Sequence, residues 1–261
     1  MDELIRKDQG LYKKYEELLL KRDQLYREAG SISTAYIREF GALMIEDFEL
    51  KVECIKKKKM IAYCQAAVNR GQAIDVESMK KEIEMSMKLY TMQLQKMLED
   101  KKRADKASKS PLYRIERAKR IYRRLAKLVH PDLNPKTEED QELSDLWNRI
   151  VIAYNCNDDK ELENLEILVL AYLKKAGIPT ETPDIENLEE RIEKLEMEIN
   201  QILTTEPYIY KEFFESKERI AARKAELREE IEDYREYSES LSEMLLYLMC
   251  EEGTVFTWHV N

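Results

Sequence analysis

The stretch YRRLAKLVHPDLNP, residues 122–135, fixes the local structure on both of its sides. Apolar residues recur three or four apart from Ala118 to Val129 and basic residues fill the other positions, which predicts an amphipathic helix over 114–129. Proline lacks a backbone N–H and disfavours helical geometry in the residue before it, so this helix is expected to end near His130. Pro135 delays the start of the next helix.

The residues after this stretch predict a second helix that lies along the first. Thr137 or one of its neighbours is expected to cap it, with acidic residues at its positive end. Its apolar face consists of Leu143, Leu146, Trp147, Ile150, Ala153 and Tyr154. We therefore expect an antiparallel helix pair with an exposed loop at its tip, which presents the His130 imidazole and the Asp132 carboxylate. A further helix is predicted over 160–175.

The rest of the chain predicts long helices. Only 6 Gly and 6 Pro occur in 261 residues, so turns are few. Helices are expected over 2–29, with Gly30 as its C-cap, over 35–69 and over 76–105. Apolar residues spaced three and four apart over 185–202, and then every seven residues from Phe213 to Leu248, are typical of coiled coils. We expect these last two helices to fold back as an antiparallel hairpin.

These patterns predict an all-α protein in which elongated helical or coiled-coil arms flank an antiparallel helix pair. The expected segments are an N-terminal long-helix region at 1–107, the unit with the helix pair at 108–176, a helical hairpin at 177–252 and a short tail at 253–261. The tail contains His259, which has no nearby set of metal ligands. We expect no cofactor and no metal site.

Charge and composition exclude several classes of protein. The formal net charge is −9, which disfavours a general nucleic-acid binder. The charge is nevertheless uneven, because residues 101–129 hold twelve Lys or Arg against two acidic residues. The 4 Cys are far apart, as is usual in a reducing compartment, and no apolar run is long enough to span a membrane. The N-terminus lacks the apolar core of a signal peptide, so we expect a cytoplasmic protein.

Residues 112–165 resemble the J-domain of DnaJ-type co-chaperones. The likeness runs from the basic helix KRIYRRLAKLV through HPD and LNP to LWNRIVIAY. The tripeptide alone is a weak signal. Tyr122-x-x-Leu125-Ala126 before it and Ile150-x-x-Ala153-Tyr154 after it stand at the spacing of the family.

The resemblance implies a binding partner and the residues that meet it. J-domains bind an ATP-bound DnaK-type chaperone and stimulate its ATP hydrolysis, and they are not enzymes themselves. The family's loop engages the chaperone, and its basic helix meets an acidic surface there. Asp132 is expected to accept charge-assisted hydrogen bonds from an arginine of the partner. The partner-binding residues implied here are His130, Pro131, Asp132 and Asn134 in the loop, and Lys119, Arg120, Arg123, Arg124 and Lys127 on the helix.

The sequence departs from the family in two places. The short first helix with Asp-Tyr-Tyr-x-x-Leu-Gly is missing, so either SPLY and the end of the 76–105 helix replace it or the domain is abbreviated. The segment DDKELENLEILVLAYL is more acidic and apolar than the family's fourth helix and looks suited to packing. The client held by the arms is not identified by the sequence, and a homo-oligomer is compatible with the coiled-coil faces.

Three other hypotheses remain beside this one. In the first, the chain is a structural scaffold, its J-like unit is inactive, and His130 and Asp132 merely end a helix. In the second, it is an enzyme, but no nucleophile, phosphate loop or acidic metal cluster accompanies the His-Asp pair. In the third, the basic stretch 101–127 binds nucleic acid, which would make binding strongly salt-dependent.

Overall fold

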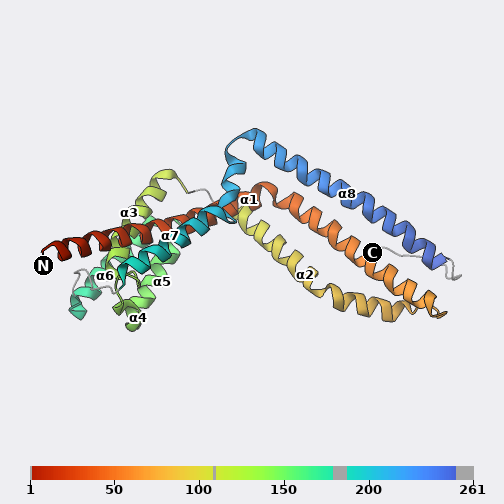
Figure 1. Ribbon diagram of the computed structural model, residues 1–261, viewed down its shortest axis with the longest axis horizontal. Helices are drawn as coiled ribbons and strands as arrows, with labels where there is room; N and C mark the ends of the chain where they lie inside the picture. Colours follow the sequence, from red (N-terminus) through yellow and green to blue (C-terminus); the bar gives the residue numbers. More distant parts are fainter. Residues whose placement is uncertain (1, 108–109, 179–186, 251–261) are drawn as a thin grey trace. The chain divides into compact units, whose positions relative to one another are not determined.

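The computed structural model describes residues 2–107, 110–178 and 187–250, and it describes side chains from residue 10 to residue 249 within those ranges. Every regular element in the described ranges is helical, which confirms the all-α class. The elements are α1 (Asp2–Asn69), α2 (Val76–Lys106), α3 (Leu112–Val129), α4 (Lys136–Glu139), α5 (Gln141–Asn155), α6 (Asp159–Ala176), α7 (Leu188–Thr204), the 3-10 helix η1 (Tyr208–Phe214) and α8 (Lys217–Cys250) (Figure 1). The predicted tail at 253–261 lies outside the described residues.

Two compact units form, and each contains segments that are distant in the sequence. Unit 1 comprises Met1–Ile32 and Ser108–Ile209, and unit 2 comprises Ser33–Ala107 and Tyr210–Asn261. The four segments expected from the sequence are consecutive, and their boundaries stay a prediction. Helix α1 contributes residues to both units because it is one unbroken helix.

The predicted break of α1 at Gly30 is wrong. The hydroxyl of Ser31 donates a hydrogen bond to the carbonyl of Arg27, four residues earlier, instead of capping a new helix. Ala29 and Tyr36 on either side are buried, so packing holds the helix across the glycine. The helix ends at the turn before Gly71, which has a positive φ of 61°.

The core of unit 1 forms between α3, α5 and α6. Apolar residues of all three helices share one cluster, including Leu125 of α3, Ile150 of α5 and Leu165 of α6, each with no exposed surface. The predicted apolar faces of the helix pair are thereby confirmed. The suggestion that 160–175 packs against a neighbour is also confirmed, because α6 buries Leu162, Leu165, Val169 and Leu173.

Helices α1 and α7 pack together in the same unit. Leu19 of α1 lies in a cluster with Ile192 and Leu195 of α7, and Leu25 of α1 packs with Ile199 and Ile202. Figure 1 shows α7 running beside the first part of α1. The seam predicted over 185–202 therefore has α1 as its partner, whereas a hairpin with the following helix was expected.

In unit 2, the later part of α1 packs with α2 and α8. Met79, Ile83 and Met87 of α2 are buried against Met60 and Cys64 of α1, so this Met-rich face of α2 is a helix seam. Leu241 of α8 packs with Cys54 and Ile61 in a separate cluster. The heptad positions of α8 thus also meet α1. Asp75 caps α2 by accepting hydrogen bonds from the backbone of Glu77 and Ser78.

Candidate functional site

The loop between α3 and α5 begins where Pro131 ends the helix. His130 has an extended backbone, with φ −68° and ψ 129°, as the following proline requires. Its carbonyl accepts hydrogen bonds from the backbone N–H groups of Leu133, at 2.9 Å, and Asn134, at 2.7 Å. These bonds close a compact turn that carries the Asp132 side chain away from α3.

Asn134 holds the loop to the end of α3. Its amide nitrogen donates to the carbonyl of Leu128 at 2.9 Å, and its side-chain oxygen accepts from the backbone N–H of Lys136 at 3.2 Å. The next cap belongs to Asp140, which accepts from the N–H groups of Glu142 and Leu143. Thr137, one of the residues expected to cap this helix, is buried and its hydroxyl has no hydrogen-bond partner.

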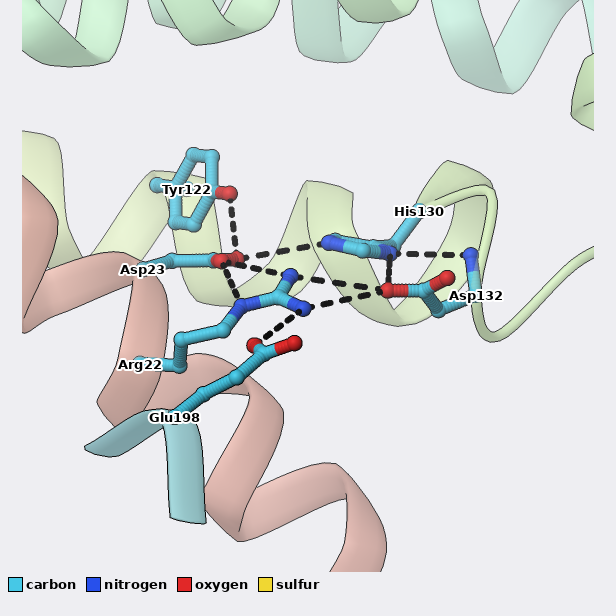
Figure 2. Close-up of polar contacts among 6 residues, drawn as sticks. All are labelled: Arg22, Asp23, Tyr122, His130, Asp132 and Glu198. Atoms are coloured by element: carbon cyan, nitrogen blue, oxygen red, sulfur yellow. Dashed lines mark hydrogen bonds and ion pairs between the residues drawn. The ribbon is translucent and has the colours of Figure 1, made fainter. Parts of the chain in front are cut away.

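The imidazole of His130 is buried, which makes the predicted exposure of this loop wrong. Only 5% of the residue is exposed. Its Nδ1 accepts a hydrogen bond from the backbone N–H of Asp132 at 3.0 Å, so the proton of the neutral ring belongs on Nε2. That nitrogen lies 3.4 Å from the Asp23 carboxylate (Figure 2). The ring also packs edge-on against Trp147, with centroids 4.7 Å apart.

Helix α1 covers the loop with an adjacent cation and anion, Arg22 and Asp23. The Arg22 guanidinium lies 3.4 Å from Asp132, 3.0 Å from Asp23 and 3.6 Å from Glu198 of α7. Asp23 also accepts a hydrogen bond from the Tyr122 hydroxyl at 2.8 Å. Figure 2 shows these side chains converging from α1, α3, α7 and the loop. The partly buried Arg22 cation is thus paired with three carboxylates within one network.

The pKa values of this network follow from burial and from the neighbouring charges. Burial opposes ionisation of Asp23, but the hydrogen bond and charge of His130, with the charge of Arg22, hold its pKa below the ordinary 3.8. Burial and the adjacent Asp23 carboxylate raise the pKa of Tyr122 well above its usual range. Asp23 is therefore an anion and Tyr122 a neutral donor at neutral pH.

An apolar contact anchors the loop as well. Leu133, directly after Asp132, is 1% exposed and packs with Tyr15 and Leu19 of α1 and with Ile192 and Leu195 of α7. A hollow of about 390 Å³ beside the loop is lined by Arg22, Asp23 and Tyr26 of α1 and by His130, Asp132 and Trp147, among others. The loop therefore packs against α1 and α7 and also borders a hollow that α1 helps to line.

The basic residues of α3 fall into two groups. Arg124 makes two hydrogen bonds to Glu166 of α6, at 2.6 and 2.8 Å, and Lys127 lies 2.6 Å from Glu16 of α1. Among the residues that the structure describes, Lys119, Arg120 and Arg123 form no ion pair. Arg120 and Arg123 are exposed, and Lys119 is half-buried. The cationic surface left for a partner is thus the middle of α3.

Four residues of α1 and α7 that take part in these contacts were not found from the sequence: Glu16, Arg22, Asp23 and Glu198. The only local signal was the pair Arg22–Asp23, which follows Leu19 and Leu20 within an otherwise apolar stripe of α1. A charged pair beside a helix seam is common on solvated faces and does not identify a distant partner.

Searches against protein-family models, curated proteins and solved structures find no match to this chain. In the described part of the chain, no helix is both long enough and apolar enough to cross a membrane.

Proposed function

We propose that this protein is a J-domain-type co-chaperone that binds a DnaK-type chaperone in the cytoplasm and stimulates its ATP hydrolysis. One observation carries the proposal: a basic helix, α3, leads directly into His130–Pro131–Asp132 on an antiparallel helix pair, and its exposed cations Arg120 and Arg123 form no ion pair with the residues that the structure describes. The helices outside the J-like unit are proposed to hold the target, either directly or through a second copy of the chain.

The expected chemistry is recognition, not catalysis by this chain. Arg120 and Arg123 steer an acidic surface towards α3, mainly by raising the association rate. The Asp132 carboxylate is proposed to bind a guanidinium of the chaperone. In the structure, Arg22 already places a guanidinium 3.4 Å from this carboxylate. The Asp132 carboxylate is therefore placed where it binds an arginine side chain while the turn keeps its conformation.

The test compares ATP hydrolysis by a purified DnaK-type chaperone with and without the full-length protein. The variant Arg120→Glu/Arg123→Glu reverses two exposed charges and leaves every described internal ion pair in place, so its effect reports partner contact. Lys160→Glu, an exposed charge reversal on α6, is the matched control. We expect stimulation by the wild type and Lys160→Glu, and its loss in the double variant. Absence of stimulation by all forms of the chain would overturn the proposal.

A scaffold with an inactive J-like unit is the second candidate. The burial of His130 and Leu133 favours it, because these side chains serve internal packing. Under this hypothesis the Arg120→Glu/Arg123→Glu variant behaves as the wild type in every assay. His130→Gln/Asp132→Asn is a weaker discriminator, because both residues belong to the buried network and their replacement also perturbs the fold.

A further inference from the structure

The contacts that α1 makes with the J-like unit involve the side chains that the resemblance assigns to the chaperone. Arg22 lies against Asp132, and Glu16 lies against Lys127 at the loop end of the basic helix. The partner contacts implied for the family are of the same two kinds: an arginine on the loop carboxylate and acidic groups on the basic helix. Helix α1 thus supplies both kinds of contact from within the chain.

We propose that α1 and α7 form an internal cap that competes with the chaperone for the loop, so that the closed chain is autoinhibited. This inference rests on the proposed function. A chaperone arginine and Arg22 cannot both occupy the same Asp132 carboxylate, and Leu133 has to leave its place between α1 and α7 before a partner surrounds the loop. Binding to the chaperone therefore requires the cap to open first.

Opening the cap leaves the J-like unit largely intact. Its core is built from α3, α5 and α6, and Leu20 is the single buried α1 residue in that cluster. The helices α1 and α7 have their own apolar contacts with each other, through Leu25 with Ile199 and Ile202. The cap and the J-like unit thus each have a packed core. Their boundary includes the loop, the Tyr122–Asp23 hydrogen bond and the contacts of Arg27 with Tyr154 and Asn157.

One part of this boundary, the contact between Arg22 and Asp132, is a modest ionic contact. The Arg22–Asp132 distances are 3.4 and 3.5 Å, at the long end of the hydrogen-bond range, and the Asp132 side chain is 39% exposed. Partly exposed ion pairs of this kind contribute little free energy. The apparent affinity for the chaperone is lowered by the small fraction of open chain, and any change that raises that fraction raises the affinity in proportion.

Two variants remove the cap contacts without altering the loop. Arg22→Ala deletes the cation on Asp132, and Leu19→Ala removes a fully buried apolar contact with Leu133. Lys14→Ala is the matched control, because it breaks the ion pair between α1 and Glu196 of α7 and does not touch the loop. The readout is stimulation of ATP hydrolysis at a concentration of the chain below saturation.

A second readout detects opening without any chaperone. The chain has 2 Trp, so Trp258→Phe leaves Trp147, which packs on His130, as the single tryptophan. We expect Arg22→Ala and Leu19→Ala in this background to increase quenching of Trp147 by iodide, and Lys14→Ala to leave it unchanged.

We expect both cap variants to stimulate ATP hydrolysis by the chaperone about fivefold or more above the stimulation by the wild type and by Lys14→Ala. Equal stimulation by the wild type and the cap variants, with increased Trp147 quenching in those variants, overturns autoinhibition and leaves the proposed function supported. Unchanged Trp147 quenching in both cap variants also overturns it. If no variant stimulates while the cap variants open, the proposed function fails, and the inference fails with it.

Discussion

The hydroxyl of Tyr122 donates a hydrogen bond to the Asp23 carboxylate at 2.8 Å, across 99 residues of sequence. Tyr122 is buried and stacks on Tyr154, with ring centroids 3.9 Å apart. Tyr122→Phe keeps the stack and removes one donor from a buried anion. We expect the free energy of unfolding to fall by about 1–3 kcal/mol, measured by urea denaturation.

The control for this substitution is Tyr113→Phe, which removes the same hydroxyl at an exposed position of α3. It should leave the urea midpoint unchanged. If both variants have the midpoint of the wild type, the Tyr122 hydroxyl does not stabilise Asp23.

Acid should open the network around Asp23. Its pKa in the folded chain lies below the ordinary 3.8, so its contribution to stability is fully present above that pH. The contribution is lost as the pH falls through the lowered value, where the carboxylate binds a proton. The ¹³C NMR signal of the Asp23 carboxyl group should stay at its ionised position from pH 7 to about pH 5 and move only in strong acid.

Asp23→Asn is the comparison for the acid experiment. This variant lacks the ionisable group, so the signal that disappears from its spectrum identifies the carboxyl resonance of Asp23. An Asp23 carboxyl signal that titrates with a midpoint well above pH 4 would contradict the lowered pKa of Asp23.

Leu133→Ala should destabilise unit 1. The side chain fills the space between Tyr15, Leu19, Ile192 and Leu195, so its truncation leaves a cavity where the loop meets α1 and α7. The expected loss is about 2–5 kcal/mol of unfolding free energy in a thermal or urea melt. Leu112→Ala, at a position 81% exposed, should change stability by less than about 0.5 kcal/mol.

Thiol reactivity separates the described cysteines. Cys54 and Cys64 are buried and Cys156 is exposed, and burial raises the pKa of the Cys54 thiol. In a Cys250→Ser background, one thiol should react rapidly with a disulfide reagent and two should react only after denaturation. Cys156→Ser should abolish the rapid phase. A rapid phase that persists would show that unit 2 opens readily.

Much of the local structure was readable because it depends on neighbours in sequence. The helix over 76–105 was predicted from its spacing and found at Val76–Lys106, and the end of α3 at Val129 follows from the position of Pro131. The buried face of α5 follows in the same way from the spacing of Leu143, Ile150 and Ala153. These features require only propensity, periodicity and the geometry of proline.

The covering of the loop by α1 and α7 could not be predicted from the sequence in the same way. Arg22 and Asp132 are 110 residues apart, and no local period connects them. The spacing over 185–202 predicted that α7 packs against another helix, but seams of Leu and Ile do not specify which seam they meet. Whether the His130 imidazole is buried depends on which helix seams pair. Its burial therefore could not be predicted without the tertiary structure.

The pairing of α1 with α7, which lies far from it in the sequence, has a consequence for synthesis on the ribosome. Leu19 and Leu25 emerge early, whereas their α7 partners Ile192 and Ile199 are made roughly 170 residues later, which takes on the order of ten seconds or more. During that interval the nascent chain carries an apolar helical stripe whose partner helix, α7, has not yet been made. While it is being translated, the protein that we propose recruits a chaperone therefore itself carries a segment that resembles a chaperone client.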